Sequence, residues 1–100
     1  MKVNINTVQF KADKDLKSFI NDKVEKLSGL YNGVVGGDVI LRIDNTEKEN
    51  DKVAEIKLMV KGSSLFAKKQ SKTFEEAIDT AVEALRKQLL KYKEKTKERK

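Results

Sequence analysis

The chain contains 100 residues, 38% of them hydrophobic and 38% charged, with a formal net charge of +6 and no cysteine, histidine or proline. This length predicts one domain over residues 1–100 with a modest core. The lack of cysteine and histidine excludes disulfides, thiolate and imidazole metal sites, and catalysis by a thiol. The sequence also has no signal pattern and no apolar run long enough to span a membrane, which predicts a cytoplasmic protein.

The chain opens with a predicted strand over residues 2–10. Apolar and polar residues alternate along it, with a slip of one residue in the middle that is compatible with a bulge. The apolar residues are Val3, Ile5, Val8 and Phe10.

A helix is predicted next, with Asp13 as its N-cap and Gly29 at its end. Its apolar residues recur with the spacing of one buried stripe. They are Leu16, Phe19, Ile20, Val24 and Leu27. The following residues 32–37, NGVVGG, are predicted to form a glycine-rich loop.

Three strands should follow. Residues 38–44 and 53–60 have strand patterns, and the polar segment NTEKEND between them is expected to be a solvated loop. Residues 61–64, KGSS, predict a tight turn into a more polar strand over residues 65–72.

The last predicted element is a long helix that begins with a capping box formed by Thr73 and Glu76. Its apolar residues stay on one arc of the helix, so its packing should persist to about Tyr92. The order β-α-β-β-β-α indicates an α+β fold, with a four-stranded mixed sheet and both helices packed on one face. The residues expected between the sheet and the helices are Leu16, Phe19, Ile20, Leu27, Ile56, Leu58, Ile78, Val82, Leu85 and Leu89.

The sequence contains few of the residue patterns that enzymes use. There is no GxxxxGK[ST] phosphate loop, no GxGxxG motif after a strand and no histidine to act as a base. We therefore predict that the chain is not an enzyme and has no cofactor, no metal and no small-molecule substrate.

The positive charge is concentrated at the end of the chain. Residues 1–84 contain 14 Lys/Arg and 14 Asp/Glu, whereas residues 85–100 contain eight basic and two acidic residues. Such asymmetry indicates a polyanionic partner, either nucleic acid or an anionic membrane, and a basic tail that serves only solubility is the alternative.

The lysines of this tail, about residues 93–100, and of the preceding turn do not form a single face. On a helix, Lys91 with Lys95 and Lys93 with Lys97 make two stripes about 160° apart. A helix lying on a membrane needs an apolar side, so this pattern favours a groove with phosphates on both sides. We expect no membrane partner, and phosphate contacts that make the affinity fall steeply with salt.

Other basic residues have two possible roles. Lys23 and Lys26 on the first helix could extend the basic surface, or Lys23 could pack its stem and hold its ammonium group in water. For Lys68, Lys69 and Lys72, a solvated strand edge that blocks aggregation is favoured over an RNA contact. Exposed aromatic residues are scarce, so recognition of shape and phosphate is favoured over the reading of bases. The aromatics expected to be buried are Phe10, Phe19, Phe74 and Tyr92.

The segment TFEEAIDTAVEALRKQLLKYKEK (73–95), after a β-β-β segment and a β-α unit that ends in DKVEKLSGLY, resembles the ribosome hibernation promoting factor / protein Y family over essentially the whole chain. The most specific matches are Ala77-Ile78-Asp79, Leu85, Gln88-Leu89, Lys91, Lys93 and Lys95, and the weaker ones are Lys23, Lys26 and Leu27.

The resemblance implies a factor that binds ribosomal RNA of the small subunit, in the channel for messenger and transfer RNA, and silences translation during starvation or stationary phase. It also implies a fold similar to a double-stranded-RNA-binding domain and a protein that is monomeric when free. The RNA-binding residues that it implies are Lys23, Lys26, Lys87, Lys91, Lys93 and Lys95, to which the basic stripes add Lys97.

The sequence departs from the family pattern at two positions. Ala84 stands where many members have a lysine, so one phosphate contact is expected to be absent or moved to Arg86. Lys72 replaces an acidic residue before the last helix, which leaves the capping to Thr73. With its basic end at Lys100, the sequence resembles the short form of the family.

Two other functions remain as alternatives. One is a stand-alone double-stranded-RNA-binding module that acts on other RNAs. The other is a membrane-surface or protein-interaction domain with a basic helix.

Overall fold

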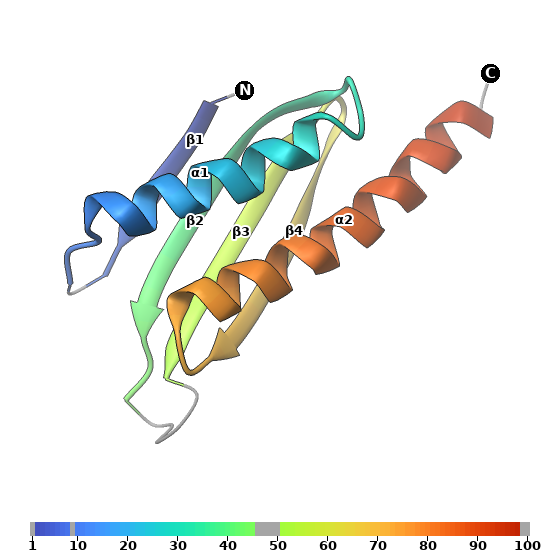
Figure 1. Cartoon of the computed structure of the whole chain (residues 1–100). Coiled ribbons are helices and arrows are strands. Elements are labelled where there is room, and N and C mark those ends of the chain that lie inside the picture. The colour runs from blue at the N-terminus through green and yellow to red at the C-terminus, as the bar shows by residue number, and fades with distance from the viewer. Residues whose placement is uncertain (1, 9, 46–50, 99–100) are drawn as a thin grey trace.

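The computed structural model describes residues 2–8, 10–45 and 51–98, with side chains up to residue 95. Two helices and four strands occur in the predicted order β-α-β-β-β-α (Figure 1). They are β1 (Lys2–Thr7), α1 (Lys14–Ser28), β2 (Val34–Ile43), β3 (Lys52–Val60), β4 (Ser63–Ser71) and α2 (Phe74–Glu98).

The four strands form one mixed sheet in the order β1-β2-β3-β4. β1 pairs with β2 in parallel, and the other two pairings are antiparallel. Helix α1 is the crossover between the two parallel strands, and α1 and α2 lie side by side on one face of the sheet (Figure 1). The predicted α+β fold is confirmed.

The core lies between this face of the sheet and the two helices. Among the residues predicted to be buried there, Leu16, Phe19 and Val82 are only partly buried and pack against the core. The remaining predicted core residues are fully buried: Ile20, Leu27, Ile56, Leu58, Ile78, Leu85 and Leu89.

Helix α1 has the predicted ends. The Asp13 carboxylate accepts a hydrogen bond of 2.8 Å from the amide of Leu16, which satisfies one of the free donors of the first turn. Gly29 forms the C-cap, and its amide donates to the carbonyl oxygen of Lys26 at 3.2 Å. Gly29 has a φ of −73°, so the end of this helix does not depend on the freedom of glycine.

Strand β1 is shorter than predicted, because it ends at Thr7 and not at residue 10. The amide of Val8 still donates to the carbonyl oxygen of Leu41, but its side chain is 45% exposed. Phe10 reaches the core from the following loop, where its ring stacks on that of Phe74 with 4.8 Å between the ring centres. The slip in the apolar pattern therefore marks the end of the strand and not a bulge.

The predicted glycine-rich loop over residues 32–37 is wrong, because β2 already begins at Val34. Gly36 lies opposite Lys2 of β1, and a Cβ atom at Gly36 would lie 2.8 Å from the Lys2 carbonyl oxygen. The glycine is thus required by the close approach of two strands. The register of β2 against β3 shifts between Val34 and Gly36, so this is where the sheet has its irregularity.

The turn between β3 and β4 is tighter than predicted. β4 begins at Ser63, so only Lys61 and Gly62 connect the two strands. Gly62 has a φ of +81°, which only glycine adopts without strain. Of the polar loop predicted between β2 and β3, residues 46–50 lie outside the described residues.

Helix α2 begins at the predicted cap, where the amide of Glu76 donates to the Thr73 hydroxyl at 3.1 Å. Its apolar arc is buried as far as Leu89, and the partly buried Tyr92 donates a hydrogen bond of 2.7 Å to the carbonyl oxygen of Lys61 in the β3–β4 turn. Packing to about Tyr92 is therefore confirmed. The helix continues to Glu98, into the basic tail.

Candidate nucleic-acid interface

Charge is divided along α2. Acidic side chains occupy the first half of the helix, where they suit the positive end of its dipole, and basic side chains occupy the second half. The acidic residues of the first half are Glu75, Glu76, Asp79 and Glu83, and the basic ones with described side chains in the second half are Arg86, Lys87, Lys91, Lys93 and Lys95, among which Glu94 is the one acidic side chain described. All five basic residues are exposed. The C-terminal half of α2 is therefore a cationic segment on a helix whose other half is packed.

One basic stripe lies on the side of α2 that faces β4. Gln88 marks this side, because its side-chain amide donates to the backbone carbonyl oxygen of Phe66 in β4 at 2.9 Å. Lys91 and Lys95 follow Gln88 by three and seven residues, which places them on the same side of the helix. We call Lys91 and Lys95 the β4-side pair.

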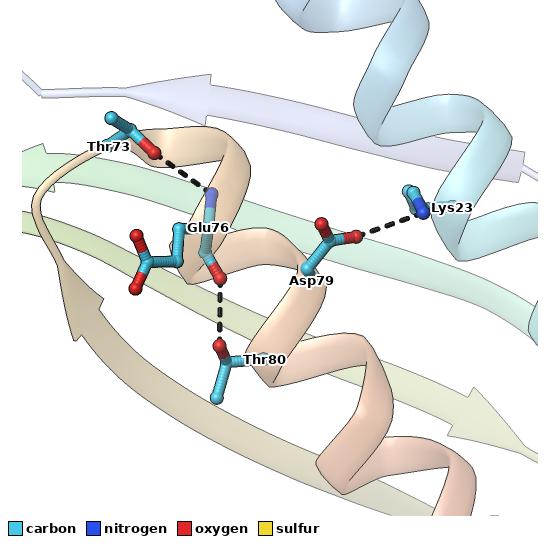
Figure 2. Close-up of polar contacts among 5 residues, drawn as sticks. All are labelled: Lys23, Thr73, Glu76, Asp79 and Thr80. Carbon is cyan, nitrogen blue, oxygen red and sulfur yellow. Dashed lines mark hydrogen bonds and ion pairs between the residues drawn. The ribbon is translucent and has the colours of Figure 1, made fainter.

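The opposite side of α2 faces α1. Asp79 marks it, because its carboxylate contacts Lys23 of α1 (Figure 2). Arg86 and Lys93 follow Asp79 at intervals of seven residues, so they continue this side toward the C-terminus. Basic side chains therefore lie on two opposite sides of α2. Lys97 lies in the helix, but its side chain is outside the described part of the chain.

Lys23 connects the two helices. Its ammonium nitrogen lies 3.0 Å from the Asp79 carboxylate (Figure 2). The same nitrogen lies 5.5 Å from the centre of the Phe19 ring. Its side chain is 33% exposed, so a phosphate could still approach it. The ion pair adds a carboxylate partner that neither sequence interpretation of Lys23 included. A phosphate at Lys23 would compete with Asp79.

Lys26 and Lys87 have simpler surroundings. Lys26 is exposed in the last turn of α1, where a cation suits the negative end of the helix dipole. Lys87 lies between the buried residues Leu85 and Leu89, and its exposed side chain projects away from the sheet. Both lysines are available to a partner.

Arg86 is held by an acidic neighbour. Its guanidinium group donates two hydrogen bonds to the Glu83 carboxylate, at 2.7 and 3.1 Å. These bonds lower the pKa of Glu83, and they raise the pKa of Arg86 above its ordinary value. Because both side chains are about half exposed, the pair restrains Arg86 without burying it.

The sequence interpretation missed the two acidic partners, Asp79 and Glu83. The spacing of Glu83 and Arg86, three residues apart on a predicted helix, was a signal for their pair. No such signal existed for Lys23 and Asp79, which are 56 residues apart and meet only because α1 packs beside α2.

The basic residues of β4 and its end lie outside these stripes. Lys68, Lys69 and Lys72 are all exposed, as expected for an edge strand. Within residues 2–8, 10–45 and 51–98, no group of three or more His, Cys, Asp or Glu side chains could hold a metal ion. In the same part of the chain, neither helix has the length and apolar character needed to cross a membrane.

Curated relatives of this chain are ribosome hibernation promoting factors. The protein of that name from Azotobacter vinelandii is 30% identical over 99 residues, which cover 99% of this chain and 89% of the relative. Its counterpart from Pseudomonas putida is 27% identical over 95 residues, which cover 95% of this chain and 89% of the relative.

Solved structures share the fold. The N-terminal domain of Thermus thermophilus protein Y superposes with a TM-score of 0.81 at 18% identity, over 92% of this chain and 99% of that structure. A ribosomal subunit interface protein from Coxiella burnetii also gives a TM-score of 0.81, at 19% identity, over 93% of this chain and 98% of that structure.

A family model covers nearly the whole chain. The model described as "Sigma 54 modulation protein / S30EA ribosomal protein" matches residues 3–97, which include both helices and all four strands apart from the first residue of β1 and the last residue of α2. The chain therefore belongs to the Sigma 54 modulation protein / S30EA ribosomal protein family, which confirms the resemblance that its helix motifs indicate.

Proposed function

We propose that this protein binds the small ribosomal subunit through the basic side chains of its two helices and inhibits translation during hibernation or stress, without catalysing a reaction. The observation that carries the proposal is the presence of exposed lysines on two opposite sides of a helix end that Leu89 and Tyr92 fix to the sheet. The ribosome hibernation promoting factors among the relatives support the choice of partner.

The proposed binding place is the channel that messenger and transfer RNA occupy. A helix with cations on one side suits a flat anionic surface, whereas cations on two sides suit an enclosed space with phosphates around it. The bound protein would occlude the channel, so translation would stop by exclusion of its substrates. Such a role places the protein in the cytoplasm, and its free form would be a monomer.

The basic residues would divide the phosphate contacts between them. The β4-side pair, Lys91 and Lys95, would hold one wall of the channel. The other wall would be held by Arg86, Lys93 and Lys97, and Lys87 would lie between the two walls. On α1, Lys23 and Lys26 would extend the contact. If about six phosphates are neutralised, the logarithm of the binding constant should fall with the logarithm of salt concentration with a slope of about −4 to −5.

Co-sedimentation with small ribosomal subunits, titrated with salt, tests the two-sided binding. We expect the double variant Lys91→Gln/Lys95→Gln and the double variant Lys93→Gln/Lys97→Gln each to weaken binding. Each should also flatten the salt slope by about one unit for every phosphate that the variant no longer neutralises. The β4-side pair should have the larger effect, because it begins one residue before Tyr92, where the helix is still bonded to the β3–β4 turn.

A matched control removes two charges elsewhere. Lys14 and Lys17 are exposed at the start of α1, so Lys14→Gln/Lys17→Gln should leave the slope nearly unchanged. If only one of the two α2 double variants weakens binding, the helix binds on a single face. If neither weakens binding, the lysines serve solubility. If excess duplex RNA displaces the protein from the subunits completely, a general double-stranded-RNA-binding module is the better description.

A further inference from the structure

The face of the sheet opposite the helices carries an exposed aromatic side chain. In β4, Leu65 and Ala67 pack against the core, so Phe66 between them points to the opposite face. Phe66 is 51% exposed, whereas the other five aromatic residues are buried or pack partly buried against the core. The exposed part of this ring is apolar surface that a partner can cover.

Two lysines lie next to this ring. Lys57 is directly opposite Phe66 on β3, and Lys68 is two residues further along β4 on the same face. Both are exposed, and neither forms an ion pair among the described residues. The ring is therefore flanked by two available cations.

The acidic residues of this face are already engaged. Asp38, opposite Lys57 in the sheet, accepts a hydrogen bond of 3.1 Å from the Asn4 side chain. Glu55, opposite Lys68, forms an ion pair of 2.9 Å with Arg42. The charge of Glu55 is thus balanced by Arg42, whereas Asp38 keeps its negative charge opposite Lys57, because the asparagine amide is neutral. The region around Phe66 is cationic toward β4, where Lys68 lies at the edge of the sheet.

This edge continues into the basic helix. Gln88 bonds to the backbone carbonyl oxygen of Phe66 itself, and Gln88 opens the row that the β4-side pair continues. Phe66 and the β4-side pair therefore lie on the two sides of one strand, β4, which has no further strand beside it among the described residues. An extended polyanion that leaves the β4-side pair can pass around this edge and reach Phe66.

We propose that Phe66, Lys57 and Lys68 form a stacking site for an unpaired base of single-stranded RNA. The ring would stack on the base, and the two lysines would contact the phosphates on either side of it. A protein partner fits less well, because the cores of protein interfaces are depleted of lysine. The site rests on the proposed function and extends it, since it needs an RNA with an unpaired segment near the bound helix.

The probe for this site is a ten-nucleotide single-stranded RNA with 2-aminopurine at its centre, whose fluorescence falls when the base stacks. We expect the protein to quench the probe. Phe66→Leu, which keeps the apolar bulk without the ring, should abolish the quench and weaken binding about 5- to 150-fold. Phe66→Tyr, which keeps an aromatic ring at this position, should retain both the quench and the affinity.

The lysines are tested separately. Lys57→Gln/Lys68→Gln should weaken binding and flatten the salt slope by about one to two units, with the quench retained at saturation. The control Lys14→Gln/Lys17→Gln should change neither the quench nor the affinity by more than a small factor. Thermal unfolding of Phe66→Leu should resemble that of the natural protein, because the side chain is half exposed.

An unchanged quench and affinity in Phe66→Leu would overturn the stacking site. So would a self-association, measured by sedimentation equilibrium, that Phe66→Leu abolishes while RNA binding stays intact, because the face would then bind a second copy of the chain. The small-subunit assay with the α2 variants is independent of this result. The quench can therefore survive a failure of the ribosome proposal, and the ribosome proposal can survive a loss of the stacking site.

Discussion

The two halves of α2 share one continuous helix but differ in almost every other respect. In the first half, Ala77, Ile78, Ala81 and Leu85 are fully buried, and the exposed charges are acidic. In the second half, Leu89 alone among the described side chains is fully buried, and the exposed charges are mostly basic. The two halves of this helix therefore have different roles. The first half stabilises the fold, and the second half carries the charge that is proposed to bind RNA.

The boundary between the two halves is the ion pair of Glu83 and Arg86. Glu83 is the last acidic residue of the first half, and Arg86 is the first basic residue of the second. A substitution in either half should therefore change one property and leave the other nearly intact. Three substitutions test this separation.

The largest effect is expected for Leu85→Ala in the packed half. Leu85 is fully buried, and its truncation should lower the free energy of unfolding by about 2–5 kcal/mol, a large share of the stability of a small domain. Urea denaturation followed by circular dichroism measures this loss. Lys91→Gln is the control and should change stability by less than about 0.5 kcal/mol, since surface charges contribute little to folding. A larger loss for Lys91→Gln than for Leu85→Ala would contradict the separation.

A smaller effect is expected at the start of the helix. Thr73→Ala removes the hydroxyl that accepts a hydrogen bond from the amide of Glu76, and it should cost about 1 kcal/mol (Figure 2). Thr80 is the matched control, because its hydroxyl bonds to the Glu76 carbonyl oxygen within the helix, where alanine is the better residue. Thr80→Ala should therefore be neutral or slightly stabilising in the same denaturation experiment, and equal losses for both variants would refute the capping role of Thr73.

The smallest effect is expected at the boundary itself. Glu83→Gln releases Arg86, so binding to small subunits should tighten and its salt slope should become steeper by about one unit. Salt-titrated co-sedimentation at neutral pH measures both changes. An unchanged or shallower slope would show that Arg86 neutralises no phosphate of its own.

The direction of the pKa shift predicts how the Glu83–Arg86 pair responds to pH. Because the pKa of Glu83 is lowered in the folded protein, the pair stabilises the fold above the ordinary carboxyl pKa. This stabilisation is lost as the pH falls through the lowered pKa. The natural protein and Glu83→Gln should therefore differ in stability at pH 7 and converge in acid.

Much of the fold could be predicted from the sequence, because its signals are local. The cap at Asp13, the end at Gly29 and the apolar arc to Tyr92 depend on residues within a few turns of one another. The start of β2 could not be predicted in this way. In the sequence, Gly36 has the appearance of a loop residue. In the structure, a glycine is needed there because the carbonyl oxygen of Lys2 on the neighbouring strand leaves no room for a Cβ atom.

The candidate site shows the same division. The basic stripes of α2 followed from helical periodicity, and the structure places Lys91, Lys93 and Lys95 on the surface. The partner of Lys23 did not follow, because it lies on a different element. The exposure of Phe66 could have been predicted, since it alternates with the core-facing Leu65 and Ala67 in a strand that the sequence indicates.

The continuity of α2 through Glu98 has an entropic consequence. The first turn of a helix is unfavourable to form and later turns are favourable to add, and the packed turns of α2 already provide the nucleus. The backbone of Lys91, Lys93, Lys95 and Lys97 therefore extends an existing helix and is ordered before any partner arrives. A coil with the same lysines would lose that backbone freedom during binding, which would weaken its affinity by about 1–2 kcal/mol for each residue that becomes fixed. In this protein the backbone entropy is lost during folding, so a polyanion binds to a row of charges that is already ordered.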